Sequence, residues 1–164
     1  MPTRTTVSNT SPLFYLHRLG QLELLPRLYG SVLVPEEVAR ELERGRHEGH
    51  DAPNLAVLDW ASVHPVSLPA SLESCNLDPG ELAAIALALT IPGCRLLLDD
   101  REARREALAR QFLVTGTLGA LDQAKREGLL TEVKPWVDRL RQLGFRISPA
   151  LYATVLEQVG ESPS

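Results

Sequence analysis

Short apolar, β-branched runs in this sequence end in clusters of polar side chains that could do chemistry. Residues 8–11 (Ser-Asn-Thr-Ser), 99–100 (Asp-Asp) and 115–117 (Thr-Gly-Thr) are such clusters. Ligands bind beyond the carboxyl ends of the strands in open parallel sheets, so we expect the three clusters to border one crevice. Glu41 and Glu81 would add acids from two neighbouring helices.

Several carboxylates that converge on one crevice repel one another unless a hard cation neutralises them. Mg²⁺ and Mn²⁺ prefer oxygen ligands and hold phosphate groups in many enzymes. Two such ions, or one ion with a positioned water molecule, can drive the hydrolysis of a phosphodiester. The acids therefore indicate metal-dependent chemistry on a phosphate-containing substrate.

Each acid also has a purely structural interpretation. Glu41 lies in "RELERG", where it could belong to a solvated helix face. Glu81 lies in the first turn of an apolar helix, where the helix dipole stabilises a carboxylate. One member of the pair Asp99 and Asp100 could cap the helix that follows. Two adjacent acids that end a buried strand still favour a functional site, which makes this pair the strongest candidate.

A run of arginines follows the acidic pair in "DDREARREALAR". Arg101, Arg104 and Arg105 leave the acidic strand end and could grip a nucleic-acid backbone. The alternative is a solvated helix face with partners four residues away. The chain contains no P-loop, no G-x-G-x-x-G and no G-x-S-x-G, so classical nucleotide sites and an α/β-hydrolase site are not indicated.

Length and composition are those of an ordinary globular protein. The chain has 164 residues, 44% of them hydrophobic and 23% charged, which predicts one domain over residues 1–160 and a frayed tail at 161–164. A net charge of −4 gives no global basic field, so nucleic-acid binding would need a local patch. The chain has only two cysteines, too few for a disulfide framework, which predicts a reduced, cytoplasmic setting. It also has no signal-peptide pattern and no long apolar run, so we expect no contact with a membrane.

Strand and helix patterns alternate along the chain, which predicts a doubly wound α/β sheet. Strands are expected at residues 4–8, 31–35, 60–68 (an edge strand because of Pro65), 94–98 and 112–116. Helices are expected from Pro12 onward and at residues 22–29, 35–45, 78–90, 101–111, 117–128, 132–144 and 148–160. Ser11, directly before Pro12, is better placed than Asn9 to cap the first helix.

Five short motifs occur in an order that resembles a known family. They are "VSNTSPL", "VPEEVARELERG", "LDPGELAAIALAL", "LLLDDREAR" and "VTGTLGALDQAKREGLL". The chain resembles the PIN-domain superfamily, and most closely its PIN-like DUF3368 branch, over nearly its whole length. The resemblance implies a three-layer α/β/α fold with a central, mainly parallel sheet. It also implies a Mg²⁺- or Mn²⁺-dependent ribonuclease of the kind found as toxins in toxin–antitoxin pairs.

The resemblance also implies which residues hold the metal and act in catalysis. The family's acidic positions fall on Asn9, Glu41, Glu81 and Asp100, with Asp99 as a further metal ligand beside the last. Thr10 and Ser11 match the small hydroxyl residues that follow the first acid. The chain departs from the pattern at Asn9, because an amide oxygen can coordinate a cation but brings no charge and cannot act as a base.

Two functions of different class follow from this departure. The first is a ribonuclease toxin, weakened by Asn9, that is held inactive by a small antitoxin protein. The second is a catalytically inactive PIN-like module that binds RNA or a protein partner. A homodimer is a further expectation, for which Trp136, Val137 and Leu140 could supply a face, although core packing would explain these residues equally well.

Overall fold

The computed structural model describes residues 4–164 and contains one five-stranded sheet in which every strand pair is parallel. The strand order is β3-β2-β1-β4-β5. The strands are β1 (Thr6–Ser8), β2 (Val32–Pro35), β3 (Ala61–His64), β4 (Arg95–Leu97) and β5 (Leu113–Thr115). Because all of them run the same way, their carboxyl ends lie along one edge of the sheet.

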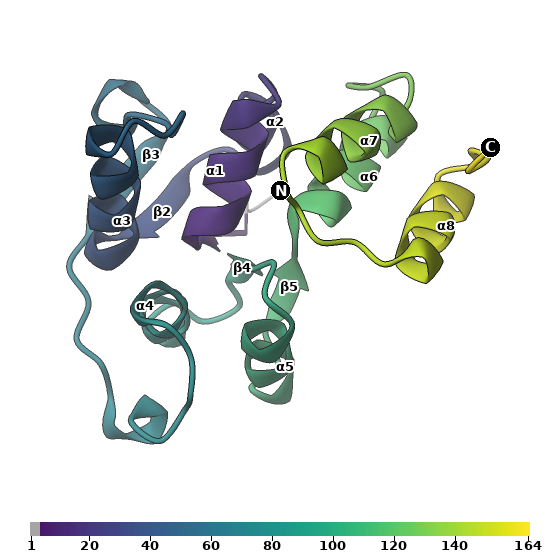
Figure 1. Ribbon diagram of the computed structural model, residues 1–164. Coiled ribbons are helices and arrows are strands. Elements are labelled where there is room, and N and C mark those ends of the chain that lie inside the picture. The colour runs from purple at the N-terminus through teal and green to yellow at the C-terminus, as the bar shows by residue number, and fades with distance from the viewer. Residues whose placement is uncertain (1–3) are drawn as a thin grey trace.

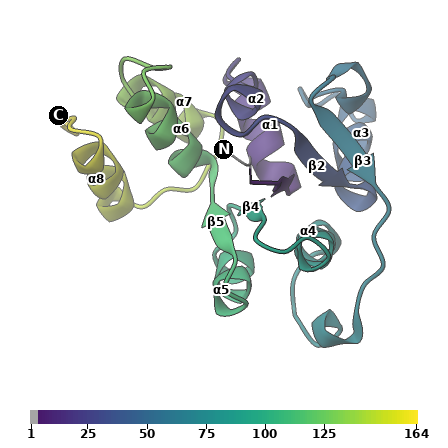
Figure 2. The same cartoon turned by 180° about the vertical axis from the view of Figure 1, so that it is seen from behind.

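Eight α-helices in the described residues cover the two faces of the sheet and make the three-layer α/β/α fold (Figure 1). They are α1 (Thr10–Arg18), α2 (Leu24–Tyr29), α3 (Glu36–His47), α4 (Pro79–Leu89), α5 (Arg101–Ala109), α6 (Thr117–Arg126), α7 (Lys134–Gln142) and α8 (Pro149–Gln158). Helices α4 and α5 lie on one face, and α1, α2, α3, α6 and α7 lie on the other. The view from behind shows the same layers, with α8 on the far side of α6 (Figure 2).

Two hydrophobic cores lie on either side of the sheet. The larger core joins the leucines of α1 and α2 to residues of α3, α6, α7 and α8. The smaller core joins Val7, Leu96 and Leu98 to the alanine-rich α4 and to α5. Val137 and Leu140 are fully buried in the larger core, so packing accounts for these two candidate dimer residues.

The start of α1 differs from the sequence prediction. The helix begins at Thr10, its N-cap residue is Asn9, and Pro12 is the third helical residue. Ser11 is therefore inside the helix and does not cap it: its hydroxyl donates to Asp99 Oδ2 at 2.6 Å. The prediction that Ser11 is the cap was wrong because a partner distant in sequence binds the hydroxyl.

Helix α3 also runs beyond its predicted end. It continues through Gly45 to His47, and Pro35 is its N-cap rather than its first helical residue. The glycine that ends it is Gly49, whose φ of +89° lies in the left-handed region that favours glycine after a helix. Strand β3 pairs only with β2 and lies at an edge, as Pro65 predicted. None of the helices described between residues 4 and 164 is long and apolar enough to cross a membrane.

Candidate active site

The strand order changes direction between β1 and β4, and such a switch point opens a crevice at the carboxyl edge of a sheet. A cleft of about 1050 Å³ lies there. It is lined by these positions that the sequence singled out: Asn9, Thr10, Ser11, Glu41, Glu81, Asp99, Asp100, Arg101, Arg104 and Arg105. The third polar cluster, residues 115–117, does not line it, and Thr115 and Gly116 line a neighbouring cavity instead. The fold thus brings together side chains from separate parts of the chain.

Asn9 follows β1 directly and is held in place through its backbone. Its N–H donates to the carbonyl of Leu97 in β4 at 3.0 Å, and its side chain does not cap α1. The residue is only 5% exposed, and Oδ1 has no hydrogen-bond partner among residues 4–164. Leaving a buried polar atom unsatisfied costs about 1–3 kcal/mol, which is typical of an atom that is kept for a ligand.

The space next to Asn9 is kept open by Gly80 in the first turn of α4. A Cβ atom at Gly80 would lie 3.1 Å from Asn9 Oδ1, 3.3 Å from Glu41 Oε2 and 3.5 Å from Asp78 Oδ1. Glu41 comes from the middle of α3, and the hydroxyl of Thr10 donates a hydrogen bond to its Oε2. Three oxygen atoms from three elements therefore point at one small space.

Glu81 lies beside this space and is part of a capping box at the start of α4. The N–H of Glu81 donates to Asp78 Oδ1 at 2.8 Å, and the N–H of Asp78 donates to Glu81 Oε1 at 3.1 Å. Glu81 is 7% exposed, and this burial is the main cause that raises its pKa from 4.5 to about 7. The negative charges of Asp78, Asp100 and Glu41 raise the pKa of Glu81 further.

The two adjacent aspartates have different partners. Asp100 is exposed and caps α5, because its Oδ2 accepts from the N–H of Ala103 at 3.0 Å. Asp99 joins three elements: Oδ1 accepts from the N–H of Thr117, and Oδ2 accepts from the hydroxyls of Thr117 and Ser11, each at 2.6 Å. Asp99 therefore fixes α1 and α6 to the end of β4, whereas Asp100 leaves one oxygen free of such contacts.

The arginines of α5 also differ from one another. Arg104 is partly buried and donates to the carbonyl of Leu98 at 2.9 Å, so it supports the strand end. Arg101 and Arg105 are exposed at the cleft, and Arg105 contacts Glu102, three residues before it rather than four, at 3.4 Å. A phosphate backbone would meet Arg101 and Arg105 first.

The side chains of the cleft fit a hard divalent cation in their chemistry. Its donors are all oxygens, the ligands that Mg²⁺ and Mn²⁺ prefer. The strongest sign is the buried, unpartnered Oδ1 of Asn9, which faces Glu41 Oε2 across Gly80. Within residues 4–164, however, no three Asp, Glu, His or Cys side chains are grouped closely enough to hold a metal ion by themselves. Asn9 adds an uncharged oxygen donor beside Glu41.

Sequence reasoning missed two features of this site. It did not include Asp78 among the site residues, although Asp78 Oδ1 faces the space beside Gly80. It did not identify Phe145 or Arg146, which line the cleft from the segment between α7 and α8. The D-x-x-E spacing of Asp78 and Glu81 signalled the capping box, but no local pattern in the sequence signals Phe145.

Comparison with known proteins gives one match. A family model described as a PIN domain, DUF3368, matches residues 5–161. A search of curated proteins returned no match. The matched segment, residues 5–161, contains all the strands and helices described above and every residue that lines the cleft.

Proposed function

Because this chain belongs to the PIN-domain family, whose fold is that of a nuclease, we propose that it is a metal-dependent endoribonuclease. Its active site is the cleft at the β1–β4 switch point, with Asn9, Glu41, Glu81 and Asp100 as catalytic residues. The observation that carries this proposal is the buried Oδ1 of Asn9, which has no partner in residues 4–164 and faces Glu41 Oε2.

Asn9 and Glu41 would contact Mg²⁺ or Mn²⁺ first, and Glu81, Asp99 and Asp100 would close on the ion when it binds, because no three acids in residues 4–164 are grouped closely enough to hold it as they stand. Such an ion, when bound, lowers the pKa of a coordinated water and neutralises charge on the phosphate. The protein's own groups prepare the site. Thr10 orients the Glu41 carboxylate, and Asp99 holds the ends of β4, α1 and α6 together. Burial raises the pKa of Glu81 to about 7 in the absence of an ion, and a cation bound beside it would lower that pKa and favour the carboxylate.

Asn9 sets the expected strength of metal binding. A neutral amide oxygen attracts a divalent cation less than a carboxylate would, so we expect millimolar or weaker Mg²⁺ affinity. Asn9→Asp should tighten the affinity measured by calorimetry. An unchanged affinity in Asn9→Asp would count against Asn9 as a ligand.

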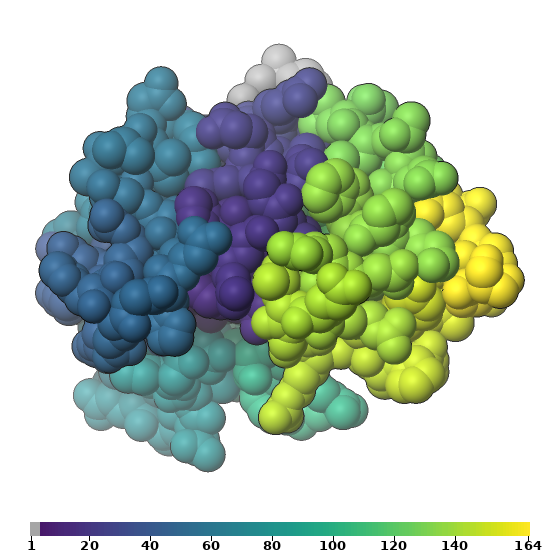
Figure 3. Space-filling view, turned by 45° about the horizontal axis from the view of Figure 1, so that its top comes forward, coloured from purple at the N-terminus to yellow at the C-terminus, as the bar shows by residue number. Residues whose placement is uncertain are grey.

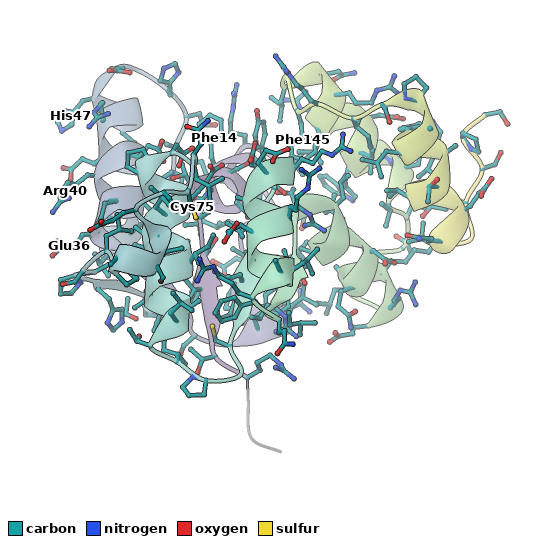
Figure 4. The ribbon with its side chains drawn as sticks, turned by 90° about the horizontal axis from the view of Figure 1, so that it is seen from below. Phe14, Glu36, Arg40, His47, Cys75 and Phe145 are labelled. Atoms are coloured by element: carbon teal, nitrogen blue, oxygen red, sulfur yellow. The ribbon has the colours of Figure 1, made fainter. Side chains whose placement is uncertain are left out.

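The central experiment measures RNA cleavage in Mn²⁺ by the wild type, Asn9→Asp, Glu41→Gln and Asp100→Ala. We expect activity in the wild type, more in Asn9→Asp, and none in the other two. Glu36→Gln is the matched control for Glu41→Gln, because Glu36 lies on the outer side of the same helix and pairs with Arg40 at 2.9 Å (Figure 4). Loss of activity in Glu36→Gln would show that the assay reports helix stability rather than chemistry.

A catalytically inactive module that binds RNA or a protein is the second candidate. It is favoured by the uncharged Asn9 and by the lack of a ready three-acid cluster in the described part of the chain. If only Asn9→Asp cleaves RNA, or if no protein in the series does, this second function replaces the first.

We further propose that the enzyme is the toxin of a toxin–antitoxin pair. It would act in the cytoplasm, as a homodimer, and a small antitoxin protein would hold it inactive. Induced expression of the wild type should then arrest growth, and Asp100→Ala should relieve the arrest. Equal arrest by both proteins would contradict a toxin that works through this cleft.

A further inference from the structure

A second cavity adjoins the catalytic cleft beside the edge strand β5. It has a volume of about 620 Å³, within the range of sites for small molecules. The cleft and the cavity share Asp99, Arg104, Phe145, Arg146 and Leu151 in their walls. A ligand in the cleft could therefore extend past Phe145 into this β5-edge cavity without leaving the protein surface.

An aromatic row stands where the two spaces meet. Phe14 and Tyr15 of α1 pack edge to face with ring centroids 5.2 Å apart, and Tyr15 packs in the same way on Phe145 at 5.1 Å. All three rings are partly exposed and line the catalytic cleft. Figure 4 shows Phe14 and Phe145 next to each other, on the inner side of α3 and away from Glu36, Arg40 and His47.

The surroundings of Phe145 combine positive charge with exposed apolar surface. Arg146 follows it in the chain and is exposed, and Arg101 and Arg105 face the same cleft from α5. Leu108 is 56% exposed and Leu151 is 44% exposed in the cleft wall. Figure 3 shows how α1 is framed by α3 on one side and by the C-terminal third of the chain, which carries Phe145, on the other.

The arginines and the aromatic rings suit the phosphate and the base, respectively, of an unpaired nucleotide. Arginines contact phosphates, and aromatic rings stack on bases that are not already paired. The β5-edge cavity also contains Asp122, Gln123 and Glu127, whose side chains can hydrogen-bond the polar edge of a base. Arg95, Arg104 and Arg146 also line this cavity and balance its acids, so the base and its own phosphate both find partners there.

We propose that Phe145 stacks a nucleobase adjacent to the scissile phosphate and that the β5-edge cavity receives that nucleotide. This inference rests on the proposed action on RNA and adds the residue that positions the strand. Tyr15 fixes the Phe145 ring from behind through their edge-to-face contact. Phe145 is thus a positioning residue, whereas Asn9, Glu41, Glu81 and Asp100 act on the phosphate.

The test separates base contacts from backbone contacts. Binding of a fluorescent octauridylate and of the same octamer without bases is measured by anisotropy in Mg²⁺ on ice, with a gel to show that the octamers stay intact. Phe145→Leu removes the π face but keeps an apolar side chain. We expect it to weaken octauridylate binding roughly five-fold or more, the lower end of base–aromatic stacking, and to leave the base-free octamer within about two-fold.

Two variants serve as controls. Phe145→Tyr keeps the ring and should bind octauridylate like the wild type. Trp136→Leu changes a partly buried aromatic residue of α7 that lines neither space, and should also bind like the wild type. Thermal unfolding of each variant verifies that Phe145→Leu is folded.

Three results of the octamer measurements would overturn the proposal. They are equal weakening of both octamers in Phe145→Leu, no weakening of either, and no binding of octauridylate by the wild type. A wild type that binds octauridylate through Phe145 but never cleaves RNA would refute only the nuclease function. A pulled-down peptide that displaces octauridylate only when Phe145 is intact would identify a protein, rather than RNA, as the natural occupant and would also overturn the proposal.

Discussion

At the scale of single residues, one amide oxygen and one missing side chain define the candidate site. Asn9 Oδ1 is buried without a hydrogen bond in the described part of the chain, and Gly80 leaves the space in front of it open. Neither residue type is the one that would make the folded protein most stable at its position. An unsatisfied oxygen costs free energy, and glycine lowers helix stability relative to alanine.

Gly80→Ala should separate metal binding from stability. The new Cβ would come within 3.1 Å of Asn9 Oδ1 and 3.3 Å of Glu41 Oε2, closer than most such contacts, and would crowd an ion there. We expect at least a ten-fold loss of Mn²⁺-dependent cleavage. The free energy of unfolding should change by less than about 1 kcal/mol, because alanine also favours the helix.

Gly45→Ala is the matched control for this prediction. Gly45 is also helical, but its nearest neighbours to a new Cβ, in His50 and Ala52, are at ordinary distances of 3.9–4.0 Å. Its substitution should stabilise α3 by up to about 1 kcal/mol and leave cleavage unchanged. Full cleavage by Gly80→Ala would contradict a site centred on this space.

The sequence located the site residues better than it described their roles. The polar clusters at the ends of β1 and β4 line one cleft with Glu41 and Glu81, but the third cluster, residues 115–117, was expected there too and instead lines the β5-edge cavity through Thr115 and Gly116. The roles of Ser11 and Asp99 could not be predicted, because their hydrogen bond spans 88 residues. Phe145 was missed for the same reason: only the folded chain places the segment after α7 beside α1.

At the scale of secondary-structure elements, helix starts position the acids. Asp78 caps α4 and Asp100 caps α5, so each carboxylate is fixed by the backbone of the helix that it begins. Near the C-terminus, the carboxylate of Glu161 likewise accepts hydrogen bonds from backbone N–H groups at the start of a helix, α7. Glu161 Oε2 and Oε1 accept from the N–H groups of Val133 and Lys134 at 2.7 and 2.9 Å, and Lys125 Nζ contacts Oε2 at 2.8 Å.

These contacts predict how stability depends on pH. Burial raises the pKa of Glu161, but Lys125 and the two N–H groups outweigh it, and the net pKa lies below its usual value of 4.5. The stabilisation is therefore present above pH 4.5 and is lost as the pH falls through the lowered pKa. Glu161→Gln should lower the free energy of unfolding by about 1–3 kcal/mol at pH 7.

Urea unfolding at pH 7, 5 and 3.5 measures this effect. The difference in unfolding free energy between the wild type and Glu161→Gln should narrow at pH 3.5, because Glu161 in the unfolded protein gains a proton below its usual pKa of 4.5. Glu157→Gln, an exposed position on α8, is the control and should show no such change. A gap of constant size at all three pH values would refute the role given to the Glu161 charge.

At the scale of the whole molecule, the sheet separates two cores, and one cysteine reports on the smaller of them. Cys94 is 1% exposed in that core, and burial raises the pKa of its thiol. Cys75 is partly exposed. Because the thiolate is the reactive form, a thiol reagent should modify Cys75 quickly in the native protein and Cys94 only when the core opens.

In the variant Cys75→Ser, Cys94 is the remaining cysteine, so the rate of reaction with the thiol reagent reports on Cys94 alone. We expect its rate to rise with urea in parallel with global unfolding measured by circular dichroism. Rapid labelling of Cys94 without urea would show that the core under α4 and α5 opens independently of the rest.

The architecture was more predictable than its arrangement in space. Alternating patterns correctly predicted an α/β fold, and Pro65 correctly predicted that β3 lies at an edge. Strand order was not predictable from such patterns, because the pairing of β1 with β4 depends on contacts between segments far apart in the chain. The end of α3 was also not predictable from local patterns. Gly45 and Gly49 are both glycines that could follow the last turn of a helix, and the structure uses Gly49.

The central position of β1 has a consequence for the newly made protein. Thr6 pairs with Val32 on one side and with Arg95 on the other, so β1 gains its second neighbour only after β4 has been synthesised. Until then Asn9 and Glu41 have no Asp100 beside them, and the cleft is incomplete. A ribonuclease built in this order would be inert until the ribosome has synthesised β4 and the acids that follow it.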